Sequence, residues 1–344
     1  MKIIRMEKEV IAGEDRRFES AHASTLLECR DGSILAAWFG GSWEKAPDTA
    51  IWTSVRRNGT WTEPRKTADA RGIACWNPVL FEGADGRIIL YYKVGAEIPE
   101  WKTFFTESFD GGESFGESRE LVEGDVSGGR GPVKNKPIRL KDGTILAPAS
   151  VEGVLWDAFA DISKDDGRTW TRSELVPLRR VQCRGESLNV PYNKYHCYGK
   201  GVIQPSLWQD REGAVHMLLR STSSRIFRAD SEDGGRTWGL AYDTGMPNNN
   251  SGLDLVCLPD DTIVLACNPR ENAPGYYKGG RTPLTLFYST DNADHFHELA
   301  VIEDGAGSFA YPAIICGRNH ELFMTYTKNR MTIGFCRLVY ENEP

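Results

Sequence analysis

The chain has 344 residues, of which 40% are hydrophobic, 26% charged and 10% aromatic, as in ordinary soluble globular proteins. Its formal net charge is −7 at pH 7. A surface that binds nucleic acid or an anionic membrane needs a basic field, so this charge argues against both. An acidic small substrate is compatible with it, because a small basic pocket can exist on an acidic protein.

The N-terminal residues 1–17 alternate charged and apolar side chains and lack the apolar core of a secretory signal. No apolar run in the chain is long enough to cross a membrane. Eight cysteines occur singly, without the paired spacing of a zinc site. We therefore expect a cytoplasmic protein with reduced, mostly buried thiols and with no metal or organic cofactor.

In chain order, the first predicted element is a strand at residues 4–12. Three β-rich runs follow at residues 24–28, 33–39 and 49–56, and a turn separates the first two. The same turn, followed by a β-rich run, returns through the chain. Its six copies are Asp31-Gly32, Asp85-Gly86, Asp142-Gly143, Glu212-Gly213, Asp260-Asp261 and Asn319-His320.

A second repeat, Ser-x-Asp-x-Gly-x-(Ser/Thr)-(Trp/Phe), keeps nearly the same period. Clear copies occupy residues 108–115, 163–170 and 231–238, a worn copy 289–296, and a degenerate copy 54–61. These copies start 54, 55, 68 and 58 residues apart. Six units at this period predict an all-β, six-bladed β-propeller of about four strands per blade, built as one domain over residues 1–344. The last unit ends after its third strand, so residues 4–12 are free to complete it and close the ring.

The repeated motif resembles the Asp-box of sialidases and related propellers, and the resemblance covers nearly the whole chain. It implies that each Asp caps its own turn and that the aromatic residue packs between blades. It also implies that the boxes lie on the face opposite the functional site. We interpret the Asp residues of the boxes as structural.

In a propeller, strand A of each blade lies nearest the axis, and the D–A and B–C loops share the face opposite the boxes. The starts of strand A supply one polar residue from each blade: His22, Asn77, Lys136, Gln204, Ser251 and Tyr311. They either line a wet tunnel or bind a ligand, and their convergence favours binding. The B–C loops add Trp43, Glu44, Asp48, Glu152, Arg220, Arg281 and Arg330. We expect the long segment 176–201 to lie over the mouth of the pocket.

A sialidase site contains three arginines that hold a carboxylate, a tyrosine nucleophile with a glutamate partner, and an aspartate acid/base. By this resemblance Asp48 takes the place of the acid/base, Tyr311 of the tyrosine, and Arg220 and Arg281 of two arginines. Two places differ. His22 stands where the first arginine is expected, and Ser251-Gly252-Leu253-Asp254 stands where the glutamate is expected. A phenol needs a carboxylate to take its proton, so we expect Asp254 or Glu152 as the partner of Tyr311.

The whole pattern is similar to the bacterial "predicted neuraminidase" group, in which His-Ala-Ser-Thr and Trp-Phe-Gly-Gly strings occur as they do here. His22 is either a hydrogen-bonded tunnel residue or an acid/base near neutral pH. Propellers that cleave rhamnose–glucuronate linkages also use a histidine, which favours the second interpretation.

The first functional hypothesis is an exo-acting glycoside hydrolase for an acidic or strongly polar terminal sugar. Arg220, Arg281 and Lys136 would hold the anion, Asp48 would protonate the leaving oxygen, and Tyr311 would attack. One alternative is a lyase for uronates, with His22 or Tyr311 as the base and the arginines stabilising the enolate. Another is a carbohydrate-binding propeller whose catalytic pair has decayed, which Gly252 favours. In each case the expected partner is a carbohydrate, and the sequence indicates no oligomeric state.

Overall fold

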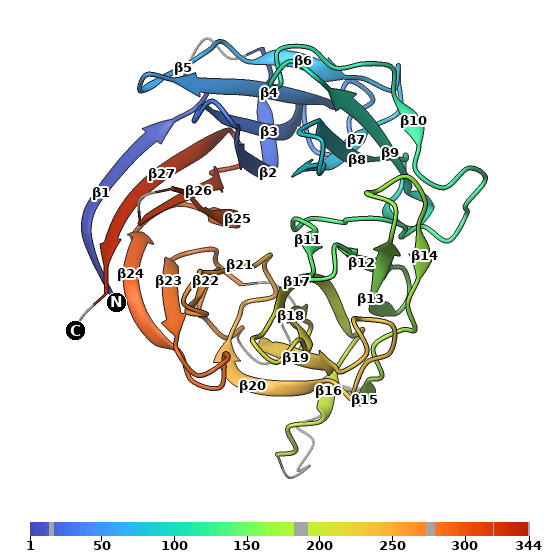
Figure 1. Ribbon diagram of the computed structural model, residues 1–344, viewed down its shortest axis with the longest axis vertical. Helices are drawn as coiled ribbons and strands as arrows, with labels where there is room; N and C mark the ends of the chain where they lie inside the picture. Colours follow the sequence, from blue (N-terminus) through green and yellow to red (C-terminus); the bar gives the residue numbers. More distant parts are fainter. Residues whose placement is uncertain (14–16, 182–191, 273–278, 319, 343–344) are drawn as a thin grey trace.

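The computed structural model describes residues 1–13, 17–181, 192–272, 279–318 and 320–342, and six antiparallel sheets surround one axis (Figure 1). Each sheet is one blade, so the predicted six-bladed β-propeller is confirmed. Blade one contains β2 (Ser20–Glu28), β3 (Ile34–Gly41), β4 (Ala50–Arg57) and β5 (Thr60–Trp61), and β6 (Arg65–Ala68) also pairs with β4. Blade two contains β7 (Cys75–Glu82), β8 (Ile88–Val94), β9 (Lys102–Ser108) and β10 (Arg119–Glu120).

The other blades keep the same order of strands from the axis outward. Blade three contains β11 (Ile138–Arg139), β12 (Ile145–Glu152), β13 (Trp156–Ser163) and β14 (Thr171–Arg172). Blade four contains β17 (Val202–Gln209), β18 (Val215–Ser221), β19 (Arg225–Ser231) and β20 (Tyr242–Pro247). Blade five contains β21 (Asp254–Cys257), β22 (Ile263–Cys267), β23 (Leu284–Ser289) and β24 (His297–Glu303).

Blade six joins the two ends of the chain. It contains β25 (Phe309–Cys316), β26 (Glu321–Lys328), β27 (Thr332–Glu341) and, as its outer strand, β1 (Lys2–Val10) (Figure 1). The β1–β27 ladder is antiparallel and runs from the pair Lys2–Glu341 to the pair Val10–Gly334. The predicted closure of the ring is therefore confirmed, with the strand beginning two residues earlier than expected.

Between blades three and four lies a short parallel pair, β15 (Arg179–Val181) and β16 (His196–Tyr198). It belongs to the long segment expected over the mouth, of which residues 182–191 lie outside the described part, as Asn319 of the last turn does. Among the described residues the helical element is the single turn η1 (Ile98–Glu100), and no described helix is long and apolar enough to cross a membrane. The seven described cysteines are free thiols, five of them buried.

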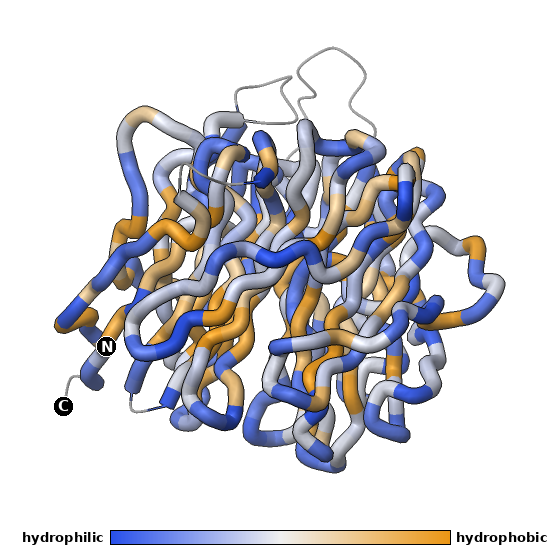
Figure 2. Tube along the Cα trace, turned by 90° about the horizontal axis from the view of Figure 1, so that it is seen from above, coloured by the Kyte–Doolittle hydropathy of each residue, from blue (hydrophilic) through white to orange (hydrophobic). Residues whose placement is uncertain are grey.

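The hydrophobic core lies between neighbouring blades. Leu35 and Phe39 of blade one share a cluster with Trp76 and Leu90 of blade two. Leu146 of blade three packs in the same way into a cluster with blade four. Figure 2 shows the result, with apolar stretches through the middle of the strands and hydrophilic loops at both faces. The loops are thus free to carry polar chemistry.

The Asp-boxes are turns that cap themselves, as predicted. In the box at 163–170, Ser163 Oγ donates to Asp165 Oδ1 at 2.8 Å, and the same Oδ1 accepts from the amide of Thr169 at 2.8 Å. The amide of Gly167, which has a φ of 85°, donates to Ser163 Oγ. Trp170 is buried against blade two. In the worn copy, Ala293 adopts a left-handed φ of 66° in the glycine position.

Candidate functional site: a cationic cluster around Tyr311

In each blade, one residue at the start of strand A, here called the axis residue, lies nearest the propeller axis. Its position can be found by counting residues back along the chain from the A–B hairpin. In blade two the amide of Gly83 closes this hairpin by donating to the carbonyl of Arg87, and Asn77 lies six residues before Gly83. The corresponding amides in the other blades are those of Cys29, Leu140, Asp210, Leu258 and Gly317. Counting back six residues from each gives the axis residues Ala23, Asn77, Lys134, Gln204, Gly252 and Tyr311.

Three of the six predicted axis residues, Asn77, Gln204 and Tyr311, therefore stand at equivalent positions. The other three need correction: the axis residues are Ala23 rather than His22, Lys134 rather than Lys136, and Gly252 rather than Ser251. In the sequence, proline directly follows the axis residues Asn77, Gln204 and Tyr311. In blade three, however, Pro137 follows a residue that lies two positions farther along the strand.

A left-handed backbone conformation marks the axis residue in four blades. The φ angle is 51° at Ala23, 38° at Asn77, 53° at Gln204 and 54° at Tyr311. The A–B ladder shifts register at each of these points. Such bulges re-aim side chains, and a non-glycine residue in this conformation costs about 1–3 kcal/mol. The fold thus accepts local strain at the axis end of several blades.

Tyr311 is the centre of the cluster. Its phenol oxygen accepts a hydrogen bond from Arg220 Nη1 at 2.8 Å and a longer one from Gln204 Nε2 at 3.4 Å. Arg220 also donates from Nη1 to Gln204 Oε1 at 3.0 Å and from Nε to Asn250 Oδ1 at 2.7 Å. Gln204 Nε2 reaches Glu152 Oε1 at 3.1 Å. Glu152 is therefore connected to the phenol through Gln204.

Arg281 lies against the same aromatic ring as Arg220. Their guanidinium carbons are 5.4 and 5.8 Å from the Tyr311 ring centroid, so the structure brings the two predicted arginines together. The pKa of Arg281 is lowered to about 10, mainly by burial and also by the charges of Arg330 and Arg220, while Tyr311 opposes the shift. Its Nη1 is buried and has no hydrogen-bond partner among the described residues. A buried, unpaired guanidinium nitrogen is costly, and an anion bound there would relieve that cost.

Arg330 adds a third guanidinium, which comes from the β26–β27 turn of blade six. It forms an ion pair with Glu44 of the β3–β4 loop in blade one. Its charge acts on both Arg281 and His22, since it lowers the pKa of each. Blade one lacks the first arginine of the sialidase pattern. Arg330 of the adjacent blade six supplies a guanidinium near the same place.

His22 packs beside Tyr311, with ring centroids 4.2 Å apart, and edge-on to Phe39. Its Nδ1 is 2.8 Å from Thr327 Oγ1, and its Nε2 is buried without a partner among the described residues. Burial lowers the pKa of His22 well below its usual value, and the charges of Arg330, Arg281, Arg220 and Lys134 add to the effect. The imidazole is therefore neutral at pH 7.

Lys134 occupies the axis position of blade three, where it is 2% exposed. Its Nζ lies 5.8 Å from the Tyr311 ring centroid. A Cβ built on Gly252 would lie 3.1 Å from Lys134 Cε and 3.2 Å from Tyr311 Cδ2. The lysine stem therefore occupies the space beside Gly252, at the place where the sialidase resemblance predicts a glutamate side chain.

Asp254 and Lys136 form a separate buried network. Lys136 Nζ donates to Asp254 Oδ2 at 2.9 Å, and the amide of Ile314 donates to the same oxygen at 2.9 Å. Asp254 Oδ1 accepts from Ser206 Oγ at 2.7 Å. The Asp254 carboxylate is thus committed to these groups rather than to the Tyr311 phenol, contrary to the prediction. Lys136 is neutralised by it, whereas Lys134 is the lysine beside Tyr311.

The β3–β4 loop carries the predicted acid and two rim residues. Asp48 is exposed, and its Oδ2 accepts from the hydroxyl of Ser42 at 2.6 Å and from the amide of Ser42 at 3.1 Å. The Ser42 hydroxyl lowers the pKa of Asp48, so the carboxylate is ionised at neutral pH. Trp43 is 63% exposed.

In blade two, Asn77 Nδ2 donates to the carbonyl of Val133 and so joins blades two and three.

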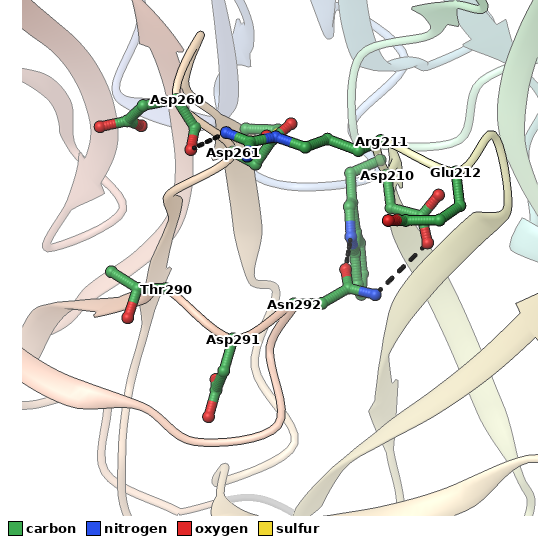
Figure 3. A pocket seen from close by; sticks show the side chains of 10 residues that line it. Asp210, Arg211, Glu212, Asp260, Asp261, Thr290, Asp291 and Asn292 are labelled. Atoms are coloured by element: carbon green, nitrogen blue, oxygen red, sulfur yellow. Dashed lines mark hydrogen bonds and ion pairs between the residues drawn. The ribbon is translucent and has the colours of Figure 1, made fainter.

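A cavity of about 240 Å³ lies on the box face, between blades four and five (Figure 3). Trp208 Nε1 donates to Asn292 Oδ1 at 2.7 Å, and Asn292 Nδ2 donates to Asp210 Oδ2 at 3.5 Å, so these groups join the two blades. Besides Asp210, the acidic residues that line the cavity are Glu212, Asp260, Asp261 and Asp291. This lining opposes an anionic ligand, whereas the Tyr311 cluster on the axis favours one.

Lys134 was missed as a site residue, whereas Arg330 was placed on the functional face by its B–C loop but was given no role there. Counting back from the A–B turn, rather than from proline, finds Lys134 in the sequence. The position of Arg330 in a B–C loop is visible in the sequence, but its relation to Arg281 and His22 depends on how neighbouring blades pack.

Residues 32–324 match the model of the BNR repeat-like domain. The chain belongs to this family. No curated protein matches the sequence. The BNR repeats are the Asp-box repeats found in the sequence, and the recognition of a sialidase-like propeller is confirmed.

Solved structures show the same fold at low sequence identity. A protein of unknown function from Dyadobacter fermentans is 17% identical, with a TM-score of 0.74 and 99% of both chains covered. The Hadza microbial sialidase Hz136 is 14% identical, with a TM-score of 0.77 over 95% of this BNR chain and 67% of that one. The NanB sialidase of Streptococcus pneumoniae is also 14% identical, with a TM-score of 0.74 over 96% and 70%. At these identities the likeness concerns the fold.

Proposed function

We propose that this BNR-repeat propeller binds a uronic-acid-type sugar at the Tyr311 cluster and cleaves, by elimination, the bond between C4 of this sugar and the sugar carried on its O4. The observation that carries the proposal is the surroundings of the phenol. Its oxygen accepts from Arg220 and Gln204, His22 packs on its ring, and the carboxylate of Asp254 is bonded elsewhere. A phenol nucleophile needs a carboxylate beside it, whereas a phenol base benefits from a guanidinium.

In this reaction Arg281, with its unpaired Nη1, holds the carboxylate of the sugar and stabilises the charge that develops on it. The Tyr311 oxygen, in the deprotonated form that a base requires and with Arg220 Nη1 as its hydrogen-bond donor, takes the proton from the carbon next to that carboxylate. The electron pair of the broken C5–H bond forms a double bond between C4 and C5, and the C4–O4 bond to the sugar carried on O4 of the uronate breaks. The proton then passes from Tyr311 to the leaving oxygen, so the enzyme returns to its starting state.

The second candidate is the hydrolase, with Tyr311 as nucleophile and Asp48 as acid. It is favoured by the position of Asp48, which is exposed on the same β3–β4 loop whose Glu44 pairs with Arg330 of the cluster. In that case Glu152, which reaches the phenol through Gln204, would take the phenol proton.

A screen of aryl glycosides and of oligosaccharides in which a uronate carries another sugar on O4 tests the proposal when it is read by both reducing sugar and ultraviolet absorbance. Elimination produces new ends together with the absorbance of the new double bond. New reducing ends without absorbance mean hydrolysis and contradict the proposal. Binding without turnover means a carbohydrate-binding role. Tyr311→Phe should abolish turnover by either route, while Tyr242→Phe, at a partly buried tyrosine in blade four, serves as the control.

A further inference from the structure

Lys134 links three blades at the axis. Its Nζ donates to Asn135 Oδ1 at 2.7 Å within blade three, to the carbonyl of Leu253 at 2.9 Å in blade five, and to the carbonyl of Pro312 in blade six. An ammonium group has three N–H donors, so each proton has an acceptor. Leu253 directly follows Gly252, and Pro312 directly follows Tyr311. The lysine thus holds the backbone on both sides of the tyrosine ring.

Tyr311 needs such support, because its φ of 54° is strained for a residue with a Cβ. Strained residues persist where the surrounding structure imposes their conformation. The Lys134 stem and the Tyr311 ring both pack over Gly252, at 3.1 and 3.2 Å from the Cβ position. A larger residue at 252 would displace one of them, so Gly252 and Lys134 depend on each other.

We propose that Lys134 is the positioning residue of Tyr311: its ammonium holds the backbone after the tyrosine, and loss of one proton releases that hold. A neutral amine has only two N–H donors and a lone pair, so one of the three oxygens would lose its hydrogen bond and face that lone pair. The role of Tyr311 in catalysis rests on the function proposed above, but its positioning by Lys134 does not.

The charge state of Lys134 changes within the physiological range. Burial lowers its pKa to about 7, the charge of Asp254 opposes this, and Lys136 and Arg220 add to it. His22 also lies within reach of the lysine charge, but its own pKa is well below its usual value. We therefore expect the hold on Tyr311 to weaken as the pH rises through about 7, and His22 to remain neutral there.

Nuclear magnetic resonance of the isotope-labelled tyrosine ζ carbons tests this without any substrate. The Tyr311 signal is identified by its absence in Tyr311→Phe. It should change with a midpoint near the pKa of Lys134, and this midpoint should be absent in Lys134→Met and in Lys134→Gln, which keeps two N–H donors. The matched control is Lys93→Met, because Lys93 is equally buried in blade two and burial lowers its pKa to about 7 as well.

Kinetics on an oligosaccharide whose uronate carries another sugar on O4 supply the second readout. Lys134→Gln should lower kcat by about tenfold or more while KM changes by less than about threefold, since a misplaced catalytic group affects the transition state more than binding. A Tyr311 midpoint that persists in both Lys134 variants, or that Lys93→Met also removes, would overturn the proposal. Absence of turnover with the expected midpoints would instead contradict the proposed function and leave the positioning role standing.

Discussion

At the scale of single residues, the cluster combines charges that stabilise an anion and a tyrosine that is not paired with a carboxylate. Arg220 and Arg281 both contact the ring of Tyr311, and the Nη1 of Arg281 is buried without a partner among the described residues. Arg330 is neutralised by Glu44, and Lys136 by Asp254. The two arginines beside Tyr311 are therefore the groups best placed to bind a carboxylate.

Replacing Arg281 by lysine should weaken the binding of D-glucuronate by roughly 1–3 kcal/mol, because the charge remains but the forked hydrogen-bonding geometry is lost. Isothermal titration calorimetry measures the change. Arg270→Lys, on the same loop and exposed, is the matched control and should bind as the wild type does. Equal affinity of Arg281→Lys and the wild type would remove Arg281 from the anion site.

Asp48→Asn separates the two reaction mechanisms. If cleavage is by elimination, this variant should keep its turnover of a natural oligosaccharide with a 4-O-linked uronate within about threefold, since Tyr311 carries the proton. If Asp48 is the acid of a hydrolase, turnover of the natural substrate should be lost, while aryl glycosides with good leaving groups keep much of theirs. Initial rates on both substrates decide the matter.

At the scale of elements, the box turns stabilise the sheets at a distance from the cluster. Hydrogen bonds from the side chain and the amide of Thr169 lower the pKa of Asp165 to about 2. Because the folded-state pKa is below the unfolded value of 3.8, this stabilisation is present above pH 3.8 and is lost as the pH falls towards 2. The box turns on one face of the propeller thus contribute to stability without contacting the Tyr311 cluster.

Asp165→Ala should lower the melting temperature at neutral pH by a few degrees, because the turn loses several hydrogen bonds. The difference from the wild type should shrink as the pH falls from 3.8 towards 2, the range over which the folded wild type loses the stabilisation from its ionised carboxylate. D-glucuronate affinity should not change. Lys164→Gln, exposed in the same turn, is the control. A melting temperature equal to the wild type at neutral pH would show that the box is dispensable for stability.

At the scale of the whole molecule, β1 closes the ring by pairing with β27 along nearly its full length. Deletion of residues 1–10 would expose the backbone edge of β27 and remove the contacts of Ile3 and Met6 with the core. We expect the truncated chain to unfold at a lower temperature and to aggregate, as differential scanning calorimetry and light scattering would show. Ile4→Thr, a substitution at an exposed residue of β1, should change neither the unfolding temperature nor the aggregation. A soluble truncated chain with the wild-type melting temperature would contradict this role of β1.

Much of this architecture could be predicted, because the box turns and the A–B hairpins have local signals that repeat in every blade. Tyr311, Arg220 and Arg281 could be found because each precedes or follows such a signal. The pairing of Asp254 with Lys136 could not, since it joins strands 118 residues apart across the axis. Lys134 was missed because proline, a local cue, marks a different position in blade three.

The central claim is that the Tyr311 cluster cleaves a uronate-type sugar by elimination rather than by addition of water. Mass spectrometry of the products formed in water labelled with heavy oxygen tests it most directly. Elimination predicts a product that is lighter by one water than the free sugar and that carries no label. A product with the full mass of the hydrolysed sugar and one labelled oxygen at its anomeric carbon would contradict the account.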